Sequence, residues 1–360
     1  MRFVCILLAG IISLTAADVH KTKNVILVTA DGLRWQELFS GIDSTLMNEK
    51  ATGMDKAASL REKLWRSSPE ERRRLLMPFF WSELVKQGVV LGNPALNSRV
   101  QVSNLFRVSY PGYSEILTGR AQDEAIRGND RIQNPTPTIL EFVRQKLSLP
   151  KSQVALFASW DVFEFIGESK PGSIHLNAGN RQVPQSEVSA QSRQLSELQP
   201  RMLTPWDSVR HDYLTFELAK DHLRTAHPRL MQISLGEMDD WAHDRRYDRV
   251  LQTIGYFDEC LKSLWTTLQS MPEYRGVTTM IVTVDHGRGP GLEDWHSHGQ
   301  KIKGAEQIWL AAIGPDTAAL GEMHDTATVL QRDIAPTILD LLNIDYHDYT
   351  GVQGHPITFR

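Results

Sequence analysis

Residues 24–32 read NVILVTADG, a short run of apolar and β-branched side chains that ends at Asp31 and Gly32. Such a continuous run is typical of a strand buried on both faces of a parallel sheet. The pattern occurs twice more: residues 230–235 (LMQISL) lead into GEMDDWAHD, and residues 278–284 (TTMIVTV) lead into DHG. Each predicted strand is therefore followed by a carboxylate.

Helical periodicity separates these predicted strands. Residues 77–87, closed by Gly88, and residues 331–342 are predicted helices. Residues 246–271 carry apolar side chains three and four positions apart, at Val250, Ile254, Phe257, Leu261, Leu264 and Leu268. This alternation predicts an α/β fold with a doubly wound, mostly parallel central sheet and helices on both faces. Ligands of such sheets bind beyond the carboxyl ends of the strands, which is where the carboxylates follow.

The size and charge of the chain narrow the function classes. Its 360 residues include 39 Lys and Arg against 43 Asp and Glu, for a formal net charge of -4. A nucleic acid polymer is not an expected partner, because proteins that bind polyanions usually carry a basic excess. Residues 18–360 are predicted to form one domain, with residues 41–74 and 167–210 as insertions that could act as a cap or lid.

The N-terminus has the pattern of a signal peptide. Arg2 precedes an uncharged apolar run over residues 3–14, and the small residues Ala16 and Ala17 follow. We predict that residues 1–17 are a signal peptide and that the protein is periplasmic or secreted, with no membrane span after cleavage. The alternative is that this segment stays uncleaved as an anchor. Cys260 would then be the only cysteine, which excludes an internal disulfide.

Asp and His residues near the strand ends are candidate metal ligands. Asp239 and His243 are four positions apart, so a helical turn would direct both side chains toward one point. Asp285 and His286 are adjacent and need a bend at the strand end to converge. Because Asp and His occur together without Cys, the set favours zinc or another divalent first-row ion over calcium, which takes oxygen ligands only.

The segment RVSYPGYSEILTGR, residues 107–120, supplies a candidate nucleophile. Residues 113–118 are predicted to form a short helix closed by Gly119, with Ser109 at or just before its N-terminus. The positive end of a helix dipole and the free N–H groups there favour an alkoxide and bind anions. The alternative is that Ser109 is a turn or N-cap residue, the usual role of a serine before Pro-Gly.

Five motifs, VILVTADG, SYPGYSEILTG, DDWAH, VDHG and HSHG, follow one another along the chain. In this order they resemble the alkaline phosphatase superfamily, and more closely its nucleotide pyrophosphatase/phosphodiesterase-like branch. The segment DIAPTILDLL near the C-terminus resembles that superfamily's last helix, so the resemblance covers most of the chain. It implies an alkaline-phosphatase-like three-layer sandwich.

The resemblance implies a site with two zinc ions. One ion would be held by Asp31, Asp285, His286 and the oxygen of Ser109. The other would be held by Asp239, His243 and a distal histidine, for which His298 fits best and His296 is the reserve. Three carboxylates and one alkoxide balance the charge of two divalent ions, so this site is neutral before substrate binds.

The resemblance also implies roles around a phosphoryl group. Ser109, activated by one metal, would attack phosphorus in line, and the second metal would stabilise the leaving oxygen before water hydrolyses the phosphoseryl intermediate. Asn129 would donate a hydrogen bond to a nonbridging oxygen; Asn134 is the alternative, and it could instead cap a helix. Asp240 and Asp244 are predicted to be solvated or to support the ligands.

The predicted function is an exported, metal-dependent hydrolase that cleaves a small phosphate monoester or diester. A sulfatase of the same fold is the nearest rival, although position 113 is Tyr where the sulfatase motif C/S-x-P-x-R has Arg. A non-catalytic metal-binding pseudoenzyme is the second rival. The choice between monoester and diester, and the oligomeric state, stay open. Four cations near the motifs have no spacing that places them at a phosphate: Arg34, Arg107, Arg127 and Lys303.

Six tryptophans are most simply explained as packing residues: Trp35, Trp160, Trp206, Trp241, Trp295 and Trp309. Three of them, Trp35, Trp241 and Trp295, lie beside the proposed ligand segments. We also expect some of them to wall a leaving-group pocket, where an aromatic or nucleoside group could stack.

Overall fold

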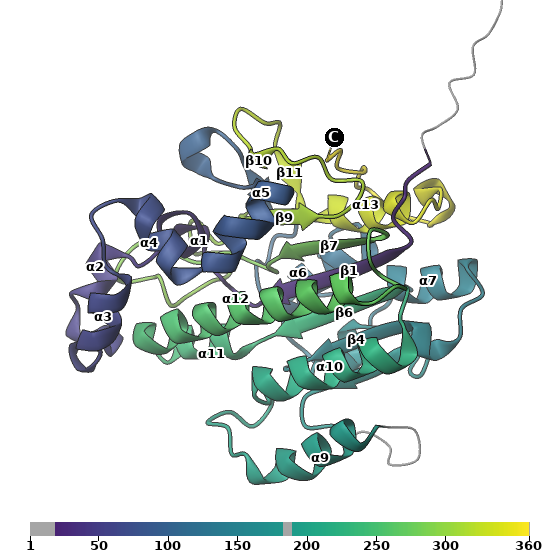
Figure 1. Cartoon of the computed structure of the whole chain (residues 1–360), viewed down its shortest axis with the longest axis horizontal. Helices are drawn as coiled ribbons and strands as arrows, with labels where there is room; N and C mark the ends of the chain where they lie inside the picture. The colour runs from purple at the N-terminus through teal and green to yellow at the C-terminus, as the bar shows by residue number, and fades with distance from the viewer. Residues whose placement is uncertain (1–18, 183–188, 360) are drawn as a thin grey trace, which may run out of the picture.

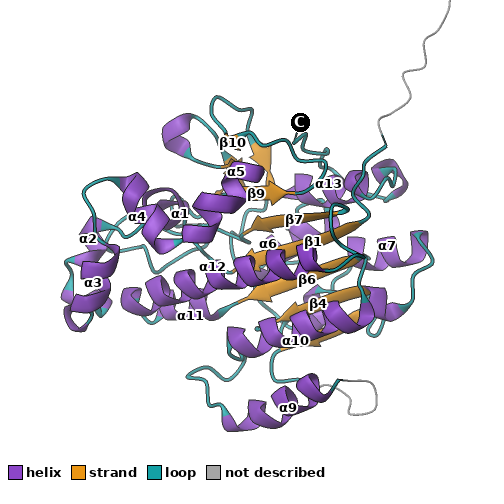
Figure 2. Ribbon diagram, viewed as in Figure 1, coloured by secondary structure: helices purple, strands orange, loops and turns teal. Residues whose placement is uncertain are grey.

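The computed structural model describes residues 19–182 and 189–359, so the predicted signal peptide lies outside the described residues. An eight-stranded sheet runs through the centre of the molecule in the order β10-β2-β9-β7-β1-β6-β4-β5 (Figures 1 and 2). Its strands are β1 (Asn24–Ala30), β2 (Val89–Leu91), β4 (Val154–Ala158), β5 (His175–Ala178), β6 (Leu230–Leu235), β7 (Thr278–Thr283), β9 (Leu310–Ile313) and β10 (Gly321–Glu322). A small second sheet contains β3 (Val100–Gln101), β8 (Gln307–Ile308) and β11 (Val329–Leu330).

The central sheet is mostly parallel, as the apolar runs predict. Strands β7, β1, β6, β4 and β5 pair in parallel, whereas β9 is antiparallel to both of its neighbours. All seven residues of β1 are buried, because this strand lies inside the sheet with helices on both faces.

Helices cover both faces of the sheet. Helices α10 and α12 cross one face, and α6, α7 and α13 pack together on the other (Figure 1). The predicted doubly wound three-layer sandwich is confirmed. The α-helices are α1 (Trp35–Ser40), α2 (Ser44–Met47), α3 (Ala58–Leu64), α4 (Pro69–Leu76), α5 (Val85–Gln87), α6 (Ser109–Thr118), α7 (Ile139–Lys146), α8 (Phe163–Ile166), α9 (Ala190–Leu198), α10 (Asp212–Ala226), α11 (Glu237–His243), α12 (Tyr247–Ser270) and α13 (Ile334–Leu341).

Two of the three longer predicted helices are observed as α-helices, and the third contains a π-helical turn. The region 246–271 forms α12, and 331–342 forms a 3₁₀ turn followed by α13. The region 77–87 contains a π-helical turn over Phe80–Leu84 before α5. Gly88 is not a left-handed cap, since its φ is -138°. Glycine is required there because a Cβ would lie 2.1 Å from the carbonyl oxygen of Ala312.

The register of three neighbouring strands brings their ends to one edge. Ala30 of β1 pairs with Leu235 of β6, and Thr29 pairs with Thr283 of β7. The residues that follow these strands therefore emerge side by side, as the sequence predicts for parallel strands. No helix in the described part of the chain is long and apolar enough to cross a membrane.

The close approach of α6 to the end of β7 predicts a large cost for one small substitution. A Cβ at Gly112 would lie 2.3 Å from the carbonyl oxygen of Asp285, so Gly112→Ala must push the helix away from the sheet. We expect a loss of about 1–3 kcal/mol in the free energy of unfolding. Gly255→Ala is the matched control, since a Cβ meets nothing within 4 Å there and alanine favours the helix by about 0.5–1 kcal/mol. Equal denaturation midpoints for the two variants would contradict the close contact.

Candidate active site

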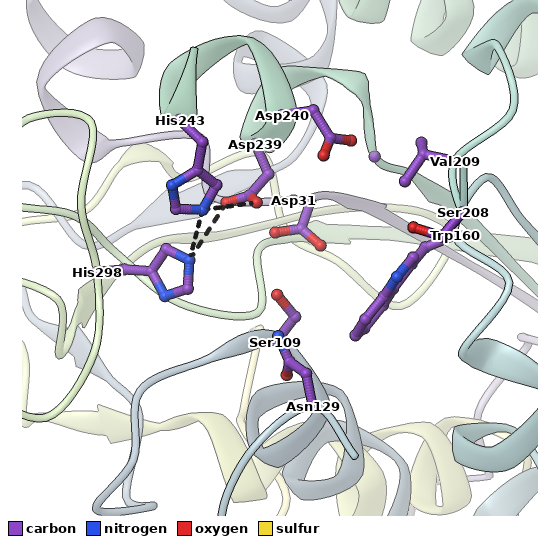
Figure 3. Close-up of a pocket in the computed structure, with 11 residues that line it drawn as sticks. Asp31, Ser109, Asn129, Trp160, Ser208, Val209, Asp239, Asp240, His243 and His298 are labelled. Carbon is purple, nitrogen blue, oxygen red and sulfur yellow. Dashed lines mark hydrogen bonds and ion pairs between the residues drawn. The ribbon is translucent and has the colours of Figure 1, made fainter. Parts of the chain in front are cut away.

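A cavity of about 200 Å³ opens at the carboxyl ends of β1 and β6 (Figure 3). It lies where a doubly wound sheet binds its ligands. Every motif except VDHG supplies at least one lining residue, and segments outside the motifs supply the others. The lining residues are Asp31, Ser109, Asn129, Trp160, Ser208, Val209, Gly236, Asp239, Asp240, His243 and His298.

One group of side chains surrounds the imidazole of His286. Its Nε2 atom lies 3.4 Å from Asp31 Oδ1, 3.3 Å from Asp285 Oδ2 and 3.3 Å from Ser109 Oγ. Each of the two carboxylates is fixed through its other oxygen, because Gly32 N donates to Asp285 Oδ1 at 3.1 Å and Tyr113 Oη donates to Asp31 Oδ2 at 3.2 Å. Their remaining oxygens therefore face the imidazole and the serine.

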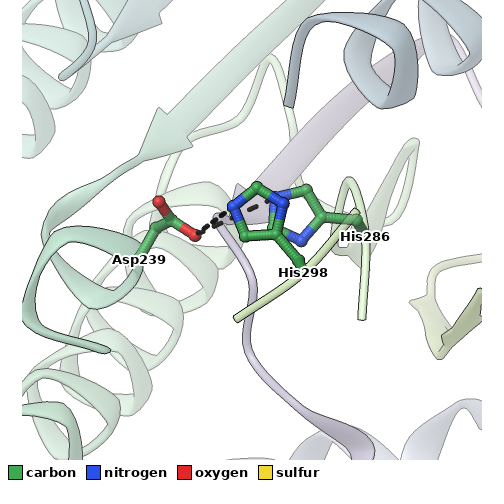
Figure 4. A group of neighbouring side chains, drawn as sticks. All are labelled: Asp239, His286 and His298. Atoms are coloured by element: carbon green, nitrogen blue, oxygen red, sulfur yellow. Dashed lines mark ion pairs between the residues drawn. The ribbon is translucent and has the colours of Figure 1, made fainter. Parts of the chain in front are cut away.

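A second group lies beside the first. Asp239 and His243 are one turn apart on α11, with His243 Nε2 at 3.1 Å from Asp239 Oδ2. His298 Nε2 lies 3.0 Å from His243 Nε2 and 3.7 Å from Asp239 Oδ1 (Figure 3). Asp239 also lies 3.9 Å from His286 Nε2, and the rings of His286 and His298 stack with centroids 3.8 Å apart (Figure 4). The two groups thus form one continuous cluster.

The tautomers of two histidines follow from their backbone partners. Nδ1 of His286 lies 3.1 Å from the carbonyl oxygen of Gly287, and Nδ1 of His298 lies 3.3 Å from that of Arg107. A carbonyl oxygen only accepts, so each Nδ1 carries the proton and each Nε2 presents a lone pair to the cluster. Burial also lowers the pKa of both imidazoles, which keeps them neutral.

Two carboxylates of the cluster, those of Asp31 and Asp285, form no ion pair with a Lys or Arg among the described residues. Burial raises the pKa of Asp31 well above its usual range, and the neighbouring Asp285 raises it further. Burial likewise raises the pKa of Asp285. Asp31 Oδ1 and Asp285 Oδ2 are buried, and neither has a hydrogen-bond partner in the described part of the chain. Buried, unpartnered carboxylate oxygens beside neutral imidazole nitrogens are a donor set suited to divalent first-row ions.

Ser109 is placed by the helix that it begins. It is the first residue of the ten-residue helix α6, after Val108 in extended conformation, and Gly119 ends the helix with φ 67°. The buried carboxylate of Glu115 accepts hydrogen bonds from the backbone of Ser103, Asn104 and Arg332, which ties α6 to the loop before it and to the 3₁₀ turn before α13. Ser109 is therefore not a capping serine: its Oγ points into the cavity.

At two positions the sequence left a choice between two residues, and in the structure the two members of each pair lie in different places. Asn129 lines the cavity, and its Oδ1 accepts from Tyr110 N at 2.9 Å. Asn134 is buried away from it and accepts from Thr136 N. His298 belongs to the cluster, whereas Nδ1 of His296 contacts Ser297 Oγ at 3.0 Å.

The two acidic neighbours of the cluster differ in position. Asp240 lines the cavity, and burial raises its pKa to about 7. Asp244 is exposed and accepts from Trp206 Nε1 at 3.2 Å.

Arg288 is a site residue that the sequence analysis missed. It is buried, and its guanidinium contacts Asp239 Oδ1 while donating to the carbonyl oxygens of Gly32 and His296. It thereby links all three strand-end segments. One sign of this role was present in the sequence, the position of Arg288 directly after VDHG. That spacing alone does not show that the side chain turns toward the cluster.

One of the six tryptophans lines the cavity, and none of the four cations near the motifs does. Trp160, rather than Trp35, Trp241 or Trp295, lines the cavity. Trp295 is buried against Tyr247, and Trp241 packs edge-on against Trp206. No Lys or Arg is among the described residues that line the cavity. Two of the four cations near the motifs are engaged elsewhere, Arg34 with Glu37 and Arg107 with Glu306.

The two insertions contribute unequally to the cavity. Residues 41–74 form α2, α3 and α4, which pack beside α1 at one end of the molecule and supply no lining residue (Figure 1). Residues 167–210 supply Ser208 and Val209.

The comparisons with known proteins concern the fold. No protein-family model matches the chain, and no curated protein matches it in sequence. Among solved structures, the chain is similar to a protein in the alkaline phosphatase superfamily from Vibrio parahaemolyticus, with 13% identity, a TM-score of 0.53, and coverage of 94% of this chain and 70% of that one.

Two further solved structures carry named activities. A variant of the alkaline phosphatase PafA has a TM-score of 0.58 at 11% identity, over 95% of this chain and 99% of that one. The 2-O GAG sulfatase BT1596 has a TM-score of 0.57 at 12% identity, over 93% of this chain and 73% of that one.

The fold and the cluster define an α/β protein with a candidate metal centre at the carboxyl edge of its sheet. More specifically, its fold is that of the alkaline phosphatase superfamily. The structures do not specify a branch, so the nucleotide pyrophosphatase/phosphodiesterase-like assignment stays a prediction.

Proposed function

We propose that the protein is an exported hydrolase of small phosphate esters that uses Ser109 as nucleophile and two divalent ions, zinc by preference. The observation that carries this proposal is the convergence of Ser109 Oγ and two buried carboxylates within 3.4 Å of His286 Nε2, which itself presents a lone pair. A hydroxyl placed among such donors is suited to nucleophilic catalysis.

The donor atoms fit two ions. Asp31, Asp285, His286 and Ser109 would hold one, and Asp239, His243 and His298 would hold the other. The donor atoms of Asp31, Asp285 and His286 lie within 4.8 Å of one another, and so do those of Asp239, His286 and His298. His243 Nε2 joins the second group at 3.1 Å from Asp239 Oδ2 and 3.0 Å from His298 Nε2. The ions, when bound, supply Lewis acidity that lowers the pKa of the serine hydroxyl and stabilises developing negative charge.

The residues of the chain then account for the remaining steps. Ser109 Oγ gives up its proton to solvent and forms a bond to phosphorus while the bond to the leaving oxygen breaks, and that oxygen takes up a proton from solvent to depart as the alcohol. Asn129, at the cavity wall, is placed to donate its amide to a nonbridging oxygen, because its Oδ1 is already oriented by Tyr110 N. Water then cleaves the phosphoseryl bond and releases phosphate, or a phosphomonoester from a diester.

The test compares three aryl esters on the purified mature protein with measured metal content. We expect an aryl phosphate or an aryl phosphodiester to be cleaved faster than the matching aryl sulfate. Faster sulfate cleavage would make the protein a sulfatase of this fold. Bound metal without turnover of any of the three esters would make it a pseudoenzyme.

Export is tested separately. We propose that residues 1–17 direct the protein to the periplasm or outside the cell. Fractionation of cells that express the full chain should find the shortened protein outside the cytoplasm, and full-length protein in the cytoplasm would contradict the proposal.

A further inference from the structure

One wall of the cavity is built by a segment that extends the end of β4. Trp160 pairs with Val209 in an antiparallel bridge, Asp161 N donates to Ser208 O at 2.9 Å, and Arg210 N donates to Ser159 O at 3.0 Å. These bonds hold the indole of Trp160 at the cavity, where its edge packs against Phe163. Figure 3 shows the indole projecting toward the space above Ser109.

Asp240 points into the same space. Its carboxylate lies across the cavity from Ser109 (Figure 3) and makes no hydrogen bond with any described residue. It is not needed to balance the ions of the proposed site, because Asp31, Asp239, Asp285 and the serine alkoxide already do so. The guanidinium of Arg288, the nearest buried cation to the ligands, contacts Asp239 instead.

The cavity therefore presents the carboxylate of Asp240 and the indole of Trp160. No Lys or Arg lines it in the described residues. A carboxylate and a tryptophan ring in one cavity are a combination that binds ammonium groups, through charge pairing and cation–π attraction. In-line displacement places the leaving alcohol opposite the nucleophile, which is the side on which Asp240 lies.

We propose that Asp240 and Trp160 select esters whose leaving alcohol carries a positively charged ammonium group. This inference rests on the proposed function and narrows its substrate class to zwitterionic phosphate esters of small amino alcohols. A cavity of about 200 Å³ suits a group of this size.

The test uses a charged ester and its uncharged isostere. Phosphocholine and neohexyl phosphate have the same shape and differ in one charge. Each is offered as the monoester and as the methyl diester, and the released alcohol is measured.

The ratio of kcat/KM for the charged ester to that for the neutral ester is expected to fall about tenfold in Asp240→Asn. Trp160→Leu should lower the ratio, and Trp160→Phe should retain more of it. A short-chain phosphatidylcholine shows whether the ester is free or part of a lipid, and Asp240-dependent release of choline from either supports the proposal.

Two controls separate this proposal from the proposed function. Asp244→Asn removes a nearby exposed charge that does not line the cavity, so its ratio should equal that of the wild type. Calorimetric binding of choline to the metal-loaded protein does not require turnover, and it should weaken about tenfold in Asp240→Asn. The inference is overturned if Asp240→Asn turns over the esters with an unchanged ratio of kcat/KM for the charged to the neutral ester. It is also overturned if choline binding does not weaken in that variant. Absence of turnover on every ester, with Asp240-dependent choline binding, overturns the hydrolase and leaves the ammonium site supported.

Discussion

Ser109→Ala is expected to lower turnover of the preferred phosphate ester by about 10⁴-fold or more, since removal of a nucleophile abolishes the covalent route. Ser109 Oγ is one of several donors around His286, so the variant should keep most of its metal. Ser109→Thr retains a hydroxyl and should keep measurable activity. The measurements are kcat/KM and metal content on the same preparations.

Ser114→Ala is the matched control for this variant. Ser114 is buried in the same helix, but its hydroxyl accepts from Gln122 Nε2 and does not line the cavity. Its replacement should cost about 1 kcal/mol of stability with little change in kcat/KM. Full activity in Ser109→Ala would remove the nucleophile from the proposed mechanism.

Removal of metal by a chelator is expected to abolish turnover and to destabilise the protein. Without cations, Asp31 and Asp285 are left as buried like charges whose facing oxygens have no hydrogen-bond partner in the described residues. Asp31→Asn should therefore stabilise the metal-free protein by about 1 kcal/mol or more, although it weakens metal binding. A substitution that damages the site is thus expected to raise the midpoint of unfolding of the chelated protein.

The sign of the pH dependence supplies a second measurement. Burial holds the pKa of Asp31 well above 3.8, so the folded metal-free chain binds more protons than the unfolded chain above about pH 4. The free energy of unfolding should then fall as pH rises from that point, and Asp31→Asn should flatten the fall. Asp55→Asn, at an exposed position, should leave the slope unchanged. Equal slopes in the wild type and Asp31→Asn would contradict the buried repulsion.

The parts of the fold that depend on local sequence patterns could be predicted from the sequence. Continuous apolar runs identified β1, β6 and β7, and a carboxylate after each of them located the edge at which they meet. Asp239 and His243 could be paired because one helical turn separates them. The convergence of His286 with Asp31 could be expected only through the family resemblance.

Other parts of the site depend on contacts between distant segments. Arg288 follows VDHG, yet its role comes from Gly32 and Asp239, which no spacing reveals. Trp160 reaches the cavity because residues 208–210 pair with the end of β4, so a tryptophan far from every motif replaces the three that lie beside the motifs. The register of the strands and the crossover connections between them, rather than the residue types, determine where Arg288 and Trp160 lie.

The proposed ligands extend from residue 31 to residue 298, and several of them lie just after the central strands β1, β6 and β7. A chain that has not yet formed this sheet holds its donors far apart and cannot assemble the cluster. A precursor that crosses a membrane unfolded would consequently be inert toward the esters of the compartment in which it is made. Activity would begin only after translocation, when the C-terminal third has folded onto the rest.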